Sequence, residues 1–122
     1  MEDLVGYKKL ILFQKSDELV IEIYKLTKLF PKDELFGLIS QMRRAAVSIP
    51  ANIVEGYSRV NKRERFQFYC IAKASLAELN YFIDLAYKLE YLNQEKFKTL
   101  DIKRNEVGKL LNGFIKYHLQ KN

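Results

Sequence analysis

The side chains best suited to chemistry in this chain are basic. Residues 35–74 hold seven Lys or Arg against two acids, a net charge of +5, whereas residues 1–34 carry −1 and residues 75–122 carry +2. Several Lys and Arg side chains presented together bind phosphates, so this zone predicts a polyanionic partner, RNA or DNA. A solvated basic face is the alternative interpretation. The candidate phosphate contacts are Arg43, Arg44, Arg59, Lys62, Arg63, Arg65 and Lys73.

Aromatic side chains lie among these cations. Tyr57 and Phe66 are the candidate exposed rings, because Phe68 and Tyr69 fit the core face of their helix better. Stacking of bases needs exposed rings. For a single bundle, these cations and rings are weak evidence for nucleic-acid binding. Repetition of the basic patch around a ring of subunits would strengthen the binding.

No catalytic constellation accompanies the basic zone. His118 has no Arg four to six residues upstream, so the helical-bundle ribonuclease pattern is missing. We expect Cys70 to be a packing residue and His118 a surface or helix-end residue. Glu55 and Glu78 could act as catalytic carboxylates, but the sequence offers neither of them a catalytic partner. One Cys and one His cannot form a Cys/His zinc site. We therefore expect no enzyme activity, no metal and no cofactor.

Length and composition fit one globular domain. The chain has 122 residues, of which 48% are hydrophobic and 30% charged. A single cysteine excludes a disulfide framework within the chain and fits a reducing compartment. No apolar run approaches the roughly 18 residues of a membrane helix, and the acidic start lacks the basic region of a signal peptide. We expect a cytoplasmic protein without membrane contact.

Apolar residues follow a helical period along the whole chain. The core-facing positions of the first three expected helices, which we call their seams, are Leu12, Ser16, Leu19, Ile23, Leu26 and Phe30 in the first, Leu35, Ile39, Met42, Ala46, Ile49 and Ile53 in the second, and Tyr69, Ala72, Leu76, Leu79, Ile83 and Ala86 in the third. Short connections between long helices favour antiparallel neighbours, so we predict an all-α, antiparallel up-down-up-down four-helix bundle forming a single domain over residues 1–122. Pro31 separates the first two helices, and Asn61 and Asn93 are the predicted N-caps of the last two. The expected helices span about residues 7–29, 33–57, 62–90 and 94–118.

The apolar faces of these helices are wider than the roughly 100° stripe that one core requires. Thick core packing is one interpretation. A second buried surface between subunits is the other, because large exposed apolar patches mark interfaces. The residues beyond the core seams are Phe13, Val20 and Tyr24 in the first expected helix and Val47, Pro50 and Val54 in the second.

A polar strip that includes Ser48, Asn52 and Glu55 runs along the second expected helix. The same helix contains Pro50, although proline in a helix interior costs about 3 kcal/mol. The short Ser and Asn side chains suggest that a neighbouring element lies close. We therefore favour an inter-helix or inter-subunit hydrogen-bond network over a solvated face. Within this proline-containing segment, the Arg43–Arg44 pair is the part expected to contact a ligand.

Several motifs resemble one family over nearly the whole chain. The most specific stretch is residues 40–53, SQMRRAAVSIPANI, and it is continued by residues 71–79, IAKASLAEL, and residues 110–115, LLNGFI. These motifs resemble the small four-helix bundle proteins encoded in intervening sequences of bacterial 23S rRNA genes. Two departures are Phe13, where the family usually has Trp, and Ala74, where it usually has Gly. Neither threatens the fold.

The resemblance implies a bundle that assembles as a ring-shaped homopentamer. It also implies a relationship to the accessory variability determinant of diversity-generating retroelements, which is basic and pentameric and associates with a reverse transcriptase and nucleic acid. On this basis we expect a non-enzymatic, oligomeric, nucleic-acid-associated protein. The alternative is a protein-interaction scaffold that docks a partner such as a reverse transcriptase without direct contact to nucleic acid.

Overall fold

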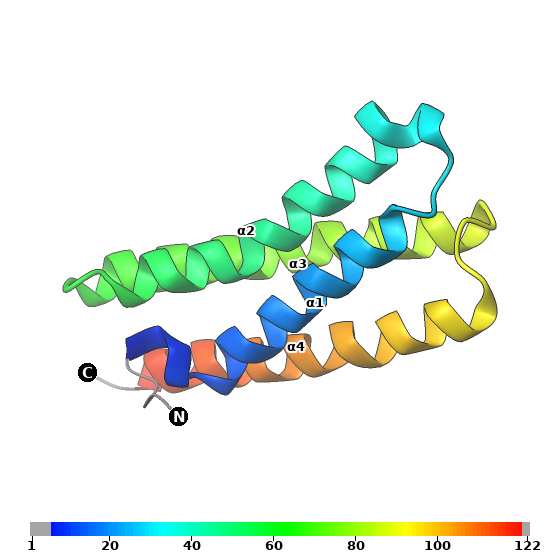
Figure 1. Cartoon of the computed structure of the whole chain (residues 1–122). Helices are drawn as coiled ribbons and strands as arrows, with labels where there is room; N and C mark the ends of the chain where they lie inside the picture. The colour runs from blue at the N-terminus through cyan, green and yellow to red at the C-terminus, as the bar shows by residue number, and fades with distance from the viewer. Residues whose placement is uncertain (1–5, 121–122) are drawn as a thin grey trace, which may run out of the picture.

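The computed structural model describes residues 6–120, and all regular structure in that range is helical. Four long helices follow one another along the chain, α1 (Ile11–Thr27), α2 (Ser40–Tyr57), α3 (Lys62–Lys88) and α4 (Gln94–Gln120). Figure 1 shows α2 and α3 lying alongside each other, with α1 and α4 completing the bundle. Among the described residues, no helix is both long enough and apolar enough to cross a membrane.

The two asparagines expected as N-caps act as caps. The Asn61 side chain accepts hydrogen bonds from the backbone N–H groups of Arg63 and Glu64, at 2.9 and 3.2 Å. Asn93 accepts one from the backbone N–H of Lys96 at 2.8 Å. Each cap satisfies donors that the first turn of a helix leaves open, which fixes the start of α3 and α4.

Three helix ends differ from the expected bounds. The first expected helix divides into a 3₁₀ segment, Gly6–Lys9, and α1, because Leu10 between them is extended (φ −70°, ψ 123°). α1 ends at Thr27, ahead of Pro31. α3 ends at Lys88, since Glu90 takes the left-handed φ of 64° that breaks a right-handed helix.

The second expected helix does not begin at residue 33. A 3₁₀ turn, Lys32–Glu34, leads into a π-helical turn, Leu35–Ile39, in which Gly37 is non-helical (φ −111°, ψ −111°), and α2 starts only at Ser40. The Glu34 carboxylate holds this turn by accepting hydrogen bonds from the Leu38 N–H at 3.2 Å and the Tyr91 hydroxyl at 2.8 Å. The turn leaves Phe36 93% exposed.

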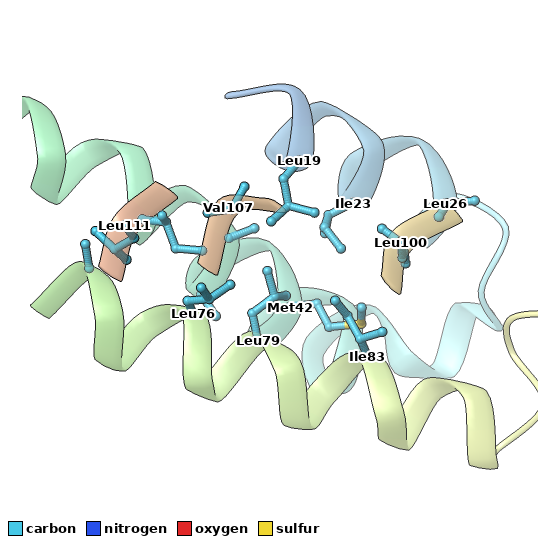
Figure 2. Packing of buried hydrophobic residues seen from close by; sticks show 14 of the residues in the cluster. Leu19, Ile23, Leu26, Met42, Leu76, Leu79, Ile83, Leu100, Val107 and Leu111 are labelled. Carbon is cyan, nitrogen blue, oxygen red and sulfur yellow. The ribbon is translucent and has the colours of Figure 1, made fainter. Parts of the chain in front are cut away.

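The predicted seams form the core. Along α1, every seam residue from Leu12 to Leu26 is buried, and along α3 every one from Tyr69 to Ala86. Leu35 is an exception: it belongs to the π-helical turn and is 48% exposed. Figure 2 shows apolar side chains from all four helices meeting in one cluster; those labelled are Leu19, Ile23, Leu26, Met42, Leu76, Leu79, Ile83, Leu100, Val107 and Leu111.

α2 and α3 approach each other most closely near the turn that joins them. A Cβ added at Gly56 would lie 2.6 Å from the ring of Tyr69, so only glycine fits there without a shift. Pro50 is buried, and α2 continues through it without a break from Ser40 to Tyr57. The close contact at Gly56 ties the end of α2 to the start of α3, where most of the basic residues lie.

Candidate nucleic-acid interface

The seven candidate cations differ in what they contact. Arg43 is half-buried between helices: its Nε donates a hydrogen bond to the Thr27 hydroxyl at 2.9 Å, and its guanidinium lies 4.6 Å from the centre of the Tyr24 ring. Both partners belong to α1. Arg43 therefore joins α2 to α1.

Arg44 faces the other neighbour of α2. Its Nη2 donates hydrogen bonds to both carboxylate oxygens of Glu78 on α3, at 2.9 and 3.0 Å, and to the Gln41 side chain at 3.0 Å. All three acceptors lie within reach of the single Nη2 atom, so its two N–H groups are shared among them and the pair lacks the parallel two-nitrogen geometry of the strongest Arg–carboxylate contacts. Glu78 thus offsets the charge of Arg44, and the Arg43–Arg44 pair that the sequence favours for ligand contact is engaged within the chain.

Two further arginines are held at the turn between α2 and α3. Arg59 forms an ion pair with Glu55 at 3.1 Å and lies 5.0 Å from the centre of the Phe68 ring. Arg65 donates a hydrogen bond to the backbone carbonyl of Arg59 and lies 5.9 Å from the centre of the Tyr57 ring. These contacts hold both guanidiniums close to the turn.

The remaining candidates are unpaired. In the part of the chain that the structure describes, the side chains of Lys62, Arg63 and Lys73 make no hydrogen bond or ion pair, and all three are exposed. Lys62 and Arg63 are adjacent at the start of α3, whereas Lys73 lies further along that helix. The end of the bundle that carries the α2–α3 turn therefore presents free positive charge.

A groove lies beside these free cations. It has a volume of about 360 Å³ and is lined by residues from the start of α3 and the end of α4, namely Lys62, Arg63, Phe66, His118 and Leu119; we call it the α3–α4 groove. The sequence indicated Phe66 as an exposed ring but gave His118 and Leu119 no role. The groove combines residues of α3 and α4 that are more than 50 positions apart, so the local spacing of residues in the sequence could not predict it.

Behind this groove lies a buried aromatic cluster. The Tyr69 ring is fully buried, with its centre 4.8 Å from that of Phe114 and 5.0 Å from that of His118. Its hydroxyl has no hydrogen-bond partner among the described residues. Burial raises the pKa of Tyr69 above its usual value, and the nearby charge of Arg65 opposes this only in part.

The second apolar face is divided. Val20 and Phe13 are half-buried; Val20 packs on the core and the Phe13 ring meets that of Tyr7 at 4.9 Å. Pro50 is buried within the chain, so it offers no surface to another subunit. Val54 is half-buried, and Tyr24 and Val47 are partly exposed. A hollow of about 410 Å³ lies beside Phe36, lined by Tyr24, Leu35, Phe36, Ile39, Ser40, Arg43 and Arg44.

The polar strip of α2 faces α3. The Ser48 and Ser75 hydroxyls are 2.8 Å apart and share a hydrogen bond between the two helices. Asn52 donates from Nδ2 to the Ser48 carbonyl at 2.7 Å and to its hydroxyl at 2.9 Å. Glu55, the third residue of the strip, pairs with Arg59 instead. Ser48 and Asn52 therefore act in a hydrogen-bond network within one chain.

One charged cluster has no counterpart in the sequence predictions. Arg104 on α4 forms ion pairs with Asp84 at 2.8 Å and Asp101 at 2.7 Å, and it donates a hydrogen bond to the Asn80 carbonyl at 3.1 Å. Burial alone would lower the pKa of Arg104, but the hydrogen bonds to Asp84 and Asp101 outweigh it and raise that pKa. The cluster joins α3 to α4. Only the Asp101–Arg104 spacing of three residues could have indicated part of it.

The structure also corrects one expectation about potential reactive groups. Cys70, expected to pack in the core, is exposed on α3, because the seam of that helix runs through Tyr69 instead. Within residues 6–120 no group of three or more His, Cys, Asp or Glu side chains is placed to hold a metal ion.

In its described residues the chain is a small all-helical protein with four long α-helices and a cationic end. Residues 8–113 match the 23S rRNA-intervening sequence protein family, and the chain belongs to that family.

A solved structure supports the same conclusion. The chain is similar to a protein with unknown function from the S23 ribosomal protein family of Bacteroides thetaiotaomicron VPI-5482, at 27% sequence identity and a TM-score of 0.80. The likeness covers 87% of this chain and 96% of that one. A search of curated proteins finds no match to the chain.

Proposed function

We propose that the protein is a non-enzymatic, nucleic-acid-associated bundle that contacts phosphates through the end carrying the α2–α3 turn. The observation that carries this proposal is the pair of exposed cations Lys62 and Arg63, adjacent at the start of α3, neither of which has a partner in the described part of the chain. Arg65, which is bonded only to a backbone carbonyl, adds to the positive potential of the same turn, whereas Glu55 offsets the charge of Arg59. Free cations attract phosphates more strongly than cations whose charge a carboxylate already offsets.

The family name, which refers to an intervening sequence in 23S rRNA, makes RNA the first polyanion to try. Labelled RNA and DNA would be titrated with the protein at several salt concentrations. We expect binding at low salt that weakens linearly with the logarithm of the salt concentration. Absence of binding to both at low salt would refute the proposal.

A matched pair of variants tests the location. Lys62→Ala/Arg63→Ala/Lys73→Ala removes three exposed cations of α3 that have no partner among the described residues, two of them at the turn, and Lys25→Ala/Lys88→Ala/Lys98→Ala removes three exposed lysines elsewhere. Both triple variants have the same net charge. We expect the first to lose more affinity and to show a shallower salt slope; equal losses would mean that net charge alone drives binding.

A second candidate function is docking or self-assembly through the surface around Phe36. This ring is 93% exposed beside the hollow of about 410 Å³, which the partly exposed Leu35 and Tyr24 also line, and a contiguous exposed apolar patch marks an interaction site. The resemblance to the family supports a homopentamer, a relationship to the accessory variability determinant, and a scaffold that docks a reverse transcriptase. The course of the chain in Figure 1 supports an antiparallel up-down-up-down bundle as the repeating unit. As to localisation, we propose that the protein is cytoplasmic.

Light scattering on size-exclusion fractions tests this candidate. We expect a species several times heavier than the 14.4 kDa chain, and a lighter one for Phe36→Ser. Val60→Ser is the matched control, because Val60 is also almost fully exposed, at 96%, but lies in the α2–α3 turn. A monodisperse 14.4 kDa wild-type species would refute self-assembly.

A further inference from the structure

The α3–α4 groove combines two kinds of chemistry. Phe66, His118 and Leu119 give it apolar and aromatic walls, while Lys62 and Arg63 bring to it two cations that have no partner within residues 6–120. Its lining residues come from the start of α3 and the end of α4, and Figure 1 shows these two helix ends at the same end of the bundle. Its volume of about 360 Å³ is within the roughly 300–1,000 Å³ range of small-ligand sites.

The His118 ring is held in a defined orientation. Its Nδ1 lies 2.9 Å from the Phe114 carbonyl oxygen, and because a carbonyl only accepts hydrogen bonds, Nδ1 carries a proton. In the neutral ring Nε2 is then an acceptor. The rings of Phe114 and Tyr69 support the imidazole, with centres at 4.4 and 5.0 Å. The aromatic wall of the groove is therefore built on the buried cluster.

We propose that the α3–α4 groove holds one unpaired nucleotide of a single-stranded nucleic acid. The base lies against Phe66 and His118, and the flanking phosphates contact Lys62 and Arg63. This inference rests on the proposed function and adds to it a preference for single strands over duplexes.

The preference follows from the two surfaces of a nucleotide. A base has an apolar π-face that stacks on aromatic side chains, and in a duplex that face is covered by the neighbouring base pairs. A duplex offers the groove only phosphates, which the two cations bind regardless of strandedness. A single strand satisfies the walls and the cations together. Glu64 is exposed and is the one acidic residue in the first turn of α3. Its negative charge repels phosphates that approach the part of the turn where it lies.

Fluorescence anisotropy with three labelled probes tests the inference. The probes are a single-stranded oligoribonucleotide, its deoxyribonucleotide counterpart, and a duplex with the same number of phosphates. We expect both single strands to bind more tightly than the duplex. Loss of one base–aromatic stack costs about 10-fold or more in affinity, so Phe66→Leu should weaken single-strand binding by that factor and leave duplex binding unchanged.

Three controls separate stacking from loss of structure. Phe66→Tyr keeps a ring and should bind single strands as the wild type does. Tyr81→Leu removes a ring that is 61% exposed elsewhere on α3 and should change nothing. Thermal unfolding by circular dichroism checks that Phe66→Leu remains folded, because Phe66 also packs on the core.

The outcomes distinguish this inference from the proposed function. Equal affinity for single strands and duplex, or unchanged single-strand affinity in folded Phe66→Leu, would overturn the inference while leaving phosphate contact by Lys62 and Arg63 intact. Absence of binding to all three probes would overturn both.

Discussion

Two pairs of adjacent cations, Arg43–Arg44 and Lys62–Arg63, have the same charge but opposite surroundings. Arg43 and Arg44 lie along α2 with a helix on either side, and each has found a partner, on α1 and α3 respectively. Lys62 and Arg63 lie at the end of the bundle, where α3 begins, and their side chains contact no described partner. The difference teaches that the acceptor groups within reach of a side chain, rather than its own charge, decide which cations remain available to a ligand.

The largest expected effect concerns the contact beneath the free pair. Gly56→Ala places a Cβ 2.6 Å from the Tyr69 ring and 3.0 Å from Phe68, so α2 and α3 must separate. We expect the free energy of unfolding to fall by about 1–3 kcal/mol, measured by urea denaturation. Gly113→Ala on α4 is the control: nothing lies within 4 Å of its added Cβ, and we expect a gain of about 0.5–1 kcal/mol. Equal effects at the two glycines would contradict the close approach.

Next in size is the removal of one cation from each pair. Arg43→Met loses the hydrogen bond to Thr27 and the contact with the Tyr24 ring, so we expect a loss of about 1–2 kcal/mol in unfolding free energy. Arg63→Met removes a side chain without partners and should change stability by less than about 0.5 kcal/mol. Urea denaturation of both variants under one set of conditions makes the comparison. A larger loss for Arg63→Met would reverse the assignment of structural and free cations.

A smaller effect is expected from the buried hydroxyl of Tyr69. Tyr69→Phe removes a hydroxyl that has no partner among the described residues, and we expect a gain of up to about 1 kcal/mol at neutral pH. Because burial raises the pKa of Tyr69, the unfolded chain releases this proton first as the pH rises above the usual value of 10.0, and the folded wild type loses stability there. Urea denaturation as a function of pH should therefore show a smaller fall in the free energy of unfolding for Tyr69→Phe than for the wild type over the same pH range. Parallel curves would show that burial does not raise the pKa of Tyr69.

The smallest expected effect is the coupling between Arg44 and Glu78. Both side chains are about half exposed, which limits the energy of the ion pair. A double-mutant cycle with Arg44→Gln and Glu78→Gln should give a coupling of about 0.2–1 kcal/mol that decreases at high salt. Zero coupling at low salt would mean that Arg44 is as free as Lys62.

The helices and their seams could be predicted from the sequence because helical periodicity is a local property. The seam of α3 from Tyr69 to Ala86 is buried throughout, and the Asn61 and Asn93 caps mark the starts of α3 and α4. The start of α2 could not be predicted. It depends on the Glu34 carboxylate, which a distant residue, Tyr91, helps to orient.

For the candidate site, the sequence could predict which residue types are present but not which contacts they make. The basic zone follows from residue types, but Tyr57 and Phe66, the rings expected to be exposed, are half-buried. The state of each cation depends on which carboxylate or hydroxyl lies near it. Nothing local links Arg44 to Glu78 or Arg43 to Thr27. The same limit applies to His118, which joins the α3–α4 groove only because α4 ends beside the start of α3.

The salt dependence of RNA binding tests the central claim most directly. Binding constants would be measured across a salt series for Lys62→Ala/Arg63→Ala and for Arg43→Ala/Arg44→Ala, each confirmed as folded by circular dichroism. If Lys62 and Arg63 contact phosphates, the slope of the logarithm of the binding constant against that of salt becomes shallower by roughly 0.7–0.9 per cation removed, while the α2 pair leaves it unchanged. A shallower slope for the Arg43/Arg44 variant together with an unchanged slope for the Lys62/Arg63 variant would contradict the account.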